Sequence, residues 1–260
     1  MSAKAARIRG FAPVEARGLS KSVQVRKGES IDILKEVDFQ ASWGQMTGIV
    51  GPSGSGKSTL LYCLAGLEQA TGGQASVLGQ PIGSMSRTKL ARFRREHLGF
   101  VFQAYNLVPT LNVEENIALP FMLRGKKPPH GEIIELLERF GLGERRKSDV
   151  GSLSGGEQQR VALARVLVSK PDVVFADEPT GALDQTSGRI VIDELHRVAS
   201  DPCRAVIVVT HANEVASRCD RVVTMVDGRM SEGAGVGFVP VQGQPLPQAQ
   251  ALAAGRGGAQ

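Results

Sequence analysis

A glycine-rich loop near the start of the chain carries its strongest chemical signal. The loop comprises Gly51, Pro52, Ser53, Gly54, Ser55, Gly56, Lys57, Ser58 and Thr59. Its glycines let successive backbone N–H groups point at phosphate oxygens, its lysine can reach the terminal phosphates of a nucleotide, and the Ser58 hydroxyl can bind Mg²⁺. An apolar run precedes the loop and helix-forming residues follow it, which is the setting this motif requires. The sequence therefore predicts a nucleotide site.

A second signal is an apolar segment that ends in two acids. Residues 173–176 are all apolar, and Asp177 and Glu178 follow them. A strand buried on both faces is continuously apolar, and α/β sheets bind ligands at the carboxyl ends of their strands. We expect Asp177 to hold Mg²⁺, directly or through water, and Glu178 to polarise the attacking water as general base. A surface turn with the same acids would not need the apolar strand before them.

A second glycine-rich turn, Leu153–Glu157, precedes a helix that we predict over residues 158–168. The bare N–H groups and the positive dipole end of a helix N-terminus can face a phosphate, and Ser154 can donate a hydrogen bond to it. An ordinary serine N-cap would explain Ser154 but would leave Gly155 and Gly156 costly in a first helical turn. The turn makes most sense if it closes over a nucleotide held by another copy of the chain.

Together these motifs resemble those of the ATP-binding subunits of ABC transporters. The loop corresponds to the family's Walker A motif, the acidic strand end to Walker B, and Leu153–Glu157 to the signature sequence. The resemblance implies that Gln103 reaches Mg²⁺ and the attacking water, and that His211 contacts the γ-phosphate of ATP. Gly181–Asp184 matches the D-loop, which crosses between two subunits. The motifs occur in family order within residues 14–230.

The resemblance also implies a homodimer. In the family, two subunits pack head to tail with two-fold symmetry and bury two ATP molecules, so each site takes its phosphate loop from one copy and its Ser154 turn from the other. One departure concerns the base, because an aromatic residue usually stacks on adenine where this chain has Val23. We therefore expect less stacking energy and weaker discrimination between bases.

Four segments resemble the lipoprotein-release and macrolide-efflux branch of the family, namely Gly99–Gln103, Asn106–Leu111, Glu115–Pro120 and Ala176–Asp184. In that branch the ATPase subunit powers export, extrusion or mechanotransmission by a separate membrane-spanning permease. We expect the permease to dock near Ala104–Leu123. Tyr105, Leu107 and Val108 are the expected contacts, as exposed apolar side chains in a loop.

Composition and charge indicate a globular protein that reaches a membrane through a partner. The chain has 260 residues, 42% of them hydrophobic, and its apolar runs are far shorter than the ~20 residues of a membrane span. It has no apolar core of a secretory signal, so we expect a cytoplasmic chain, and the resemblance to transporter subunits implies a peripheral location on the cytoplasmic face of the cell membrane. The net charge of +5 comes without a nucleic-acid-binding motif, and we predict no nucleic-acid partner. The three scattered cysteines predict buried, reduced thiols.

The order of predicted elements indicates an α/β fold. We expect a P-loop NTPase core with a mostly parallel sheet, an antiparallel β subdomain, and an inserted α-helical subdomain at about residues 104–168. The ABC ATPase domain would cover residues 14–232, after an N-terminal extension of residues 1–13. Residues 233–260, rich in glycine, proline, glutamine and alanine, are expected to form a disordered tail.

Two other classes of protein share part of this motif set. A soluble ABC ATPase of the DNA-repair or ribosome-associated type works without a membrane partner, but such chains usually carry long coiled-coil insertions or two cassettes, which this sequence lacks. A P-loop small-molecule kinase needs an acceptor pocket and has no use for the Leu153–Glu157 turn. The transporter subunit is therefore the leading prediction.

Overall fold

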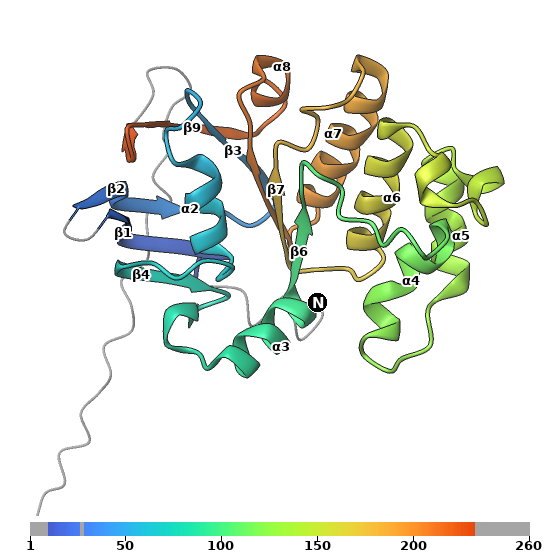
Figure 1. Cartoon of the computed structure of the whole chain (residues 1–260), viewed down its shortest axis with the longest axis horizontal. Coiled ribbons are helices and arrows are strands. Elements are labelled where there is room, and N and C mark those ends of the chain that lie inside the picture. Colours follow the sequence, from blue (N-terminus) through green and yellow to red (C-terminus); the bar gives the residue numbers. More distant parts are fainter. Residues whose placement is uncertain (1–9, 27–28, 232–260) are drawn as a thin grey trace, which may run out of the picture.

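Two β-sheets and a group of helices make up the structure, a computed structural model that describes residues 10–26 and 29–231. In Figure 1 the antiparallel strands lie on the left, the parallel sheet runs through the centre, and helices α4 to α7 lie on the right. The expected tail, residues 233–260, and residues 1–9 of the expected extension lie outside the described residues. Across the described ranges no helix combines the length and hydropathy of a membrane span.

A six-stranded sheet forms the centre of the chain. Its order is β10-β9-β3-β8-β7-β6, parallel except for the β9–β10 hairpin at one edge. Every residue of β7 and β8 is buried, which is why these strands are continuously apolar up to their carboxyl ends. The strands are β3 (Gln45–Val50), β6 (Leu98–Val101), β7 (Val173–Asp177), β8 (Ala205–Val209), β9 (Arg221–Val226) and β10 (Arg229–Ser231). The predicted parallel core is confirmed.

A four-stranded antiparallel sheet of order β2-β1-β4-β5 packs beside it. Its strands are β1 (Val14–Arg26), β2 (Glu29–Gln40), β4 (Gly72–Val77) and β5 (Gln80–Pro81). One hydrophobic cluster joins this sheet, helix α2 (Lys57–Leu64) and one face of the six-stranded sheet, through residues such as Leu19, Leu61 and Phe175. Because α2 contributes to this shared core, the loop that precedes it is fixed at the carboxyl end of β3.

The other face of the six-stranded sheet is covered by helices α4 (Val113–Met122), α5 (His130–Arg139), α6 (Gly155–Leu167) and α7 (Gln185–Ala199). A second hydrophobic cluster joins these helices to strand residues such as Val174 and Val206. The predicted helical region at residues 104–168 therefore shares a core with the sheet. The remaining helices are α3 (Arg87–His97), α8 (Asn213–Ala216) and three 3-10 turns at Ile82–Ser84, Gly143–Arg145 and Val150–Ser152.

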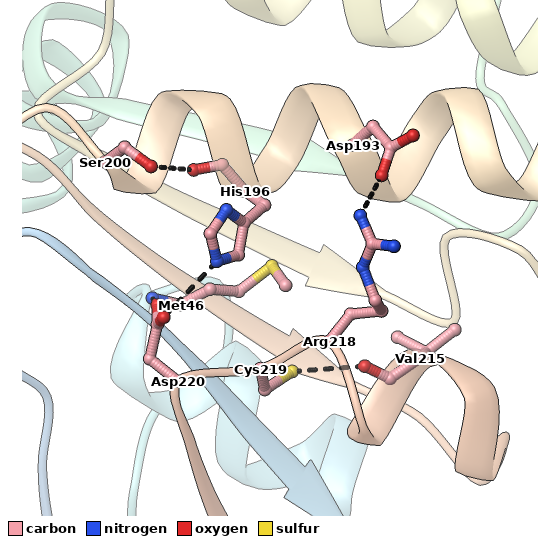
Figure 2. A network of polar contacts seen from close by, with 8 residues as sticks. All are labelled: Met46, Asp193, His196, Ser200, Val215, Arg218, Cys219 and Asp220. Atoms are coloured by element: carbon pink, nitrogen blue, oxygen red, sulfur yellow. Dashed lines mark hydrogen bonds and ion pairs between the residues drawn. The ribbon is translucent and has the colours of Figure 1, made fainter.

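A polar network ties α7 to the start of β3 and to the turn before β9 (Figure 2). The Asp220 carboxylate accepts a hydrogen bond from the Met46 backbone N–H at 2.7 Å, and its other oxygen lies 3.2 Å from the His196 Nε2. Arg218 forms an ion pair with Asp193, one turn earlier on α7. These contacts join the last turns of α7 to the amino end of β3, opposite the end that carries the phosphate loop.

The three cysteines are free thiols, but only Cys63 is buried as predicted, whereas Cys203 and Cys219 are half-buried. Burial raises the pKa of Cys63 and of Cys219 to about 11. Because the thiolate is the reactive form, a raised pKa leaves little of either thiol in that form at neutral pH.

Strand β6 stops before Gln103. It ends at Val101, so Gln103 lies in the loop beyond it. Shortly after, Tyr105 and Asn106 have φ angles of 56° and 51°. This left-handed backbone cannot continue a strand, and it turns the chain away from the sheet toward α4.

Candidate active site

The phosphate loop lies between β3 and α2, as the sequence predicts, and its glycines are needed for its shape. Gly51, Gly54 and Gly56 have φ angles of 151°, 78° and 99°, a region that other residues adopt only with strain. A Cβ at Gly51 would overlap the Met225 carbonyl oxygen. Gly56 is the N-cap of α2 and no described side chain caps the helix, so its first N–H groups remain available to a phosphate.

Lys57, the first residue of α2, lies inside the curl of this loop. Its Nζ donates hydrogen bonds to the carbonyl oxygens of Gly51 at 2.9 Å and of Pro52 at 2.7 Å. The side chain is buried, whereas the loop tip at Pro52, Ser53 and Gly54 is exposed. A buried ammonium group beside an exposed loop tip is suited to binding an anion that approaches from solvent.

Asp177 ends β7 beside the loop and is 6% exposed. The Ser58 hydroxyl donates to its Oδ1 at 2.8 Å, and the Tyr62 hydroxyl donates to its Oδ2 at 2.6 Å. Ser58 and Asp177, predicted from separate motifs, are thus brought together. Tyr62 was not among the predicted site residues. Burial, followed by the bond to Asp177, raises the pKa of Tyr62, which keeps its hydroxyl protonated as a donor.

Glu178 follows directly and is held in an unusual backbone conformation. Its φ is 46°, and its backbone N–H donates to the Val209 carbonyl at 3.0 Å. The Glu178 Oε1 lies 2.7 Å from the His211 Nδ1. The two residues meet because β7 and β8 are parallel neighbours whose carboxyl ends lie at one edge of the sheet.

Gln103 and the D-loop segment lie close to each other. A Cβ at Gly181 would lie 3.4 Å from the Gln103 Nε2, and the Gly181 N–H donates to the Glu178 carbonyl at 3.1 Å. The Asp184 carboxylate then caps α7 by accepting from the Ser187 N–H at 3.0 Å, which lowers the pKa of Asp184. Gln103, Glu178 and His211 thus gather near the carboxyl ends of β6, β7 and β8.

Ser154 is not brought to the phosphate loop of its own chain. It caps α6, which begins at Gly155 rather than at residue 158, because Ser154 and Glu157 form a capping box with bonds of 2.8 and 3.3 Å. The bond from the Ser154 backbone N–H lowers the pKa of Glu157. Helices α6 and α2 belong to the two separate core clusters on opposite faces of the six-stranded sheet (Figure 1). Within one chain, the helices that follow the two glycine-rich turns therefore pack on different faces of the sheet.

The two signature glycines also have a packing reason within the chain. A Cβ at Gly155 would lie 2.9 Å from the Tyr105 hydroxyl oxygen, and a Cβ at Gly156 would overlap the Ser187 hydroxyl. A serine N-cap together with this close packing accounts for both glycines. The structure thus adds a packing reason for both glycines beside the phosphate contact that the sequence predicts.

Replacing Gly156 with alanine is expected to destabilise the isolated chain by about 1–3 kcal/mol, the usual range for overpacking. Gly131, near the start of α5, is the matched control, since a Cβ there would meet nothing within 4 Å. Gly131→Ala should be neutral or stabilising by up to about 1 kcal/mol, because alanine favours a helix. Thermal unfolding without nucleotide measures both, and equal stability of the two variants would contradict the packing explanation.

Val23 lies on β1 with 42% of its surface exposed and is paired in register with Ile31 of β2, which is 56% exposed. Val25, two residues along the same strand, is also exposed. These aliphatic side chains provide an apolar surface without an aromatic ring. The structure thus shows an exposed side chain at the expected adenine position, as base contact requires.

The expected docking loop is more buried than the sequence suggests. Tyr105, Leu107 and Val108 are half-buried, so the expectation of three exposed apolar side chains is wrong. Arg165 donates to the Tyr105 carbonyl at 2.9 Å, and Leu107 packs against the core. The Asn116 side chain accepts a hydrogen bond from the Val108 N–H at 2.8 Å and donates one to the Val108 carbonyl at 3.1 Å. These bonds turn the loop inward.

A family model described as ABC transporter matches residues 34–181. The chain belongs to the ABC transporter family. It is 45% identical over 223 residues to the uncharacterized ABC transporter ATP-binding protein YbbA of Escherichia coli, covering 85% of this chain and 97% of YbbA. It is 42% identical over 212 residues to the lipoprotein-releasing system ATP-binding protein LolD of Zymomonas mobilis, covering 80% and 90%.

A solved structure is similar over the whole ABC cassette. The dimeric, post-hydrolysis state of the ATP-binding cassette MJ0796, bound to ADP and Pi, has a TM-score of 0.79 at 34% identity and covers 86% of this chain and 100% of that chain. The predicted ABC ATPase fold is thereby confirmed, as is the resemblance to ABC ATP-binding subunits. The chain is an ATP-binding, ATP-hydrolysing ABC transporter subunit.

Proposed function

We propose that the edge of the sheet at the phosphate loop is the site of ATP hydrolysis, with each residue in a defined role. The observation that supports this most is the convergence of Ser58 with Asp177 at 2.8 Å and of Glu178 with His211 at 2.7 Å, from motifs far apart in the sequence. The loop N–H groups and Lys57 bind the phosphates. The nucleotide-binding set is Gly51, Pro52, Ser53, Gly54, Ser55, Gly56, Lys57, Ser58 and Thr59, with Val23 against the base.

Mg²⁺ fits the donors that meet here. Ser58 and Asp177 offer a hydroxyl and a carboxylate oxygen, and Gln103 an amide oxygen, which are the hard oxygen ligands that this ion prefers. Mg²⁺ typically keeps several waters and binds through one or two protein ligands plus phosphate oxygens. When bound, it would neutralise charge on the transferred phosphoryl group.

Glu178 is the proposed general base and His211 its partner. The Glu178 carboxylate is 14% exposed and can accept a proton from a water that lies at the sheet edge. The bond to the His211 Nδ1 orients this carboxylate, and the exposed His211 ring can reach the γ-phosphate. Gln103, on the neighbouring loop, would help to position the water.

The complete site requires two chains. Because the helices that follow the Ser154 turn and the phosphate loop pack on opposite faces of the six-stranded sheet, we place both turns on one phosphate only between two copies packed head to tail. Ser154, Gly155 and Gly156 of one copy would then face the ATP of the other. We propose this homodimer for the present chain, and the dimeric MJ0796 cassette supports it.

The dimer predicts a concentration-dependent rate. ATP hydrolysis per chain should rise with chain concentration and level off once dimers predominate, because association supplies the second half of each site. Activity measured over a dilution series, with the mass followed by light scattering, tests this. A strictly monomeric preparation that hydrolyses ATP at the full rate would overturn the proposed site.

A separate membrane-spanning subunit is the proposed partner, which would make the chain a peripheral protein of the cytoplasmic membrane face. The lipoprotein-releasing system ATP-binding protein LolD supports this assignment. We place the docking region near Ala104–Leu123. Since Tyr105, Leu107 and Val108 are half-buried, the more accessible apolar side chains there are Met122 and Leu123, 51% and 67% exposed. We retain 14–232 as the ABC ATPase domain with its helical subdomain at about 104–168.

A further inference from the structure

Tyr62 occupies an unexpected place beside Asp177. It lies four residues after Ser58 on α2, so the two side chains project from the same face of the helix one turn apart. Each hydroxyl donates to a different oxygen of the same carboxylate, Ser58 to Oδ1 at 2.8 Å and Tyr62 to Oδ2 at 2.6 Å. Two hydroxyls on one face of α2 therefore donate hydrogen bonds to both carboxylate oxygens of Asp177.

The Tyr62 ring is itself held in place by aromatic packing. It contacts Phe100 of β6 with ring centroids 6.0 Å apart, and Phe100 stacks on Phe175 of β7 at 5.6 Å. Phe175 is fully buried two residues before Asp177. The ring is thus anchored to the strand that carries the carboxylate and to the strand next to it. A hydroxyl on such a support has little freedom to leave Asp177.

We propose that Tyr62 is a positioning residue for the metal-binding carboxylate. By occupying Oδ2 it fixes the rotation of the Asp177 side chain and leaves Oδ1 directed toward Ser58 and the ion. This inference deepens the proposed function and rests on its assignment of Asp177 to Mg²⁺. A buried carboxylate whose second oxygen lacks a donor is poorly satisfied and free to rotate, so the hydroxyl should favour the ion-binding orientation.

Tyr62→Phe tests the idea because it deletes the hydroxyl and keeps the ring against Phe100. In the full-length chain with ADP present, Mn²⁺ binding followed by electron paramagnetic resonance should weaken by about 10–100-fold, the usual cost of losing a hydrogen bond that orients a metal-binding side chain. The Mg²⁺ concentration for half-maximal ATP hydrolysis should rise by a similar factor. Binding of a fluorescent ATP analogue in EDTA should stay unchanged, because the loop and Lys57 are intact. If Tyr62 only stabilised the fold, the variant would not weaken metal binding while leaving nucleotide binding in EDTA unchanged.

Two further variants make the outcome unambiguous. Ser200→Ala, which removes a hydroxyl bonded to the His196 carbonyl at the far end of α7, should leave Mn²⁺ affinity unchanged. Asp177→Asn should weaken Mn²⁺ binding more than Tyr62→Phe does. If Asp177→Asn weakens it while a folded Tyr62→Phe chain binds Mn²⁺ like wild type, the role of Tyr62 is wrong and the proposed function stands. If Asp177→Asn has no effect, the metal assignment itself fails.

Discussion

Replacing Glu178 with glutamine is expected to slow ATP hydrolysis by ~10²–10⁴-fold, the usual contribution of a general base. The amide has the size of the carboxylate and can still bond to His211 across 2.7 Å, but it cannot take a proton from water. The phosphate loop, Ser58 and Asp177 are untouched, so ATP affinity should change little. Single-turnover hydrolysis and equilibrium binding of ATP measure the two effects separately.

The same variant should accumulate as an ATP-bound dimer. If ATP holds two copies together and its hydrolysis releases them, Glu178→Gln with ATP and Mg²⁺ should elute from size exclusion as a dimer, whereas wild type returns to monomer. Glu214→Gln, an exposed glutamate on α8, is the matched control and should behave like wild type. A small-molecule kinase would form no trapped dimer. If the variant hydrolysed ATP at the wild-type rate, Glu178 would not be the general base.

Lys57→Ala is expected to weaken ATP binding by about 10–100-fold, the cost of losing one hydrogen-bonded charge contact, and to lower hydrolysis further. The buried ammonium group of Lys57 places a positive charge inside the loop, where it donates hydrogen bonds to two loop carbonyls. Without it, the N–H groups of the loop remain but the phosphate charge is compensated less. Binding of a fluorescent ATP analogue gives the affinity directly.

Because Lys57 also bonds the Gly51 and Pro52 carbonyls, its loss could disturb the loop itself. Thermal unfolding without nucleotide separates this effect from phosphate binding. Lys89→Ala, at an exposed position on α3, supplies a control that removes the same charge elsewhere. Equal ATP affinity of the two variants would show that Lys57 does not contact the phosphates.

The central sheet could be predicted from sequence because its signal is local. Continuous apolar runs such as residues 173–176 and 205–209 can be satisfied only where both faces of a strand are covered, and β7 and β8 are buried along their whole length. The ends of elements were less predictable. Strand β6 ends at Val101 and leaves Gln103 in the loop beyond it, although Phe102 continues the apolar run.

The loop that the sequence predicts as the docking region is more buried than its residue types indicate. Tyr105, Leu107 and Val108 were expected to be exposed because they stand in a loop. Their half-buried state comes from Arg165 on α6 and Asn116 on α4, which bind loop carbonyls from neighbouring helices. Such partners become neighbours only when the helices pack, so no pattern within the loop reveals them.

The chemical groups of the site could be predicted from the chain alone, because the loop Gly51–Thr59 and the acids Asp177 and Glu178 are local motifs with backbone and charge requirements that each residue shows. How these groups come together depends on the packing of strands and helices. The parallel order of β7 and β8 sets Glu178 against His211, and the face of α2 that meets β7 gives Asp177 the Tyr62 hydroxyl. The placement of α2 and α6 on opposite faces of the sheet keeps Ser154 from the phosphate loop of its own chain. Distances between distant segments depend on packing, and no spacing along the chain encodes them.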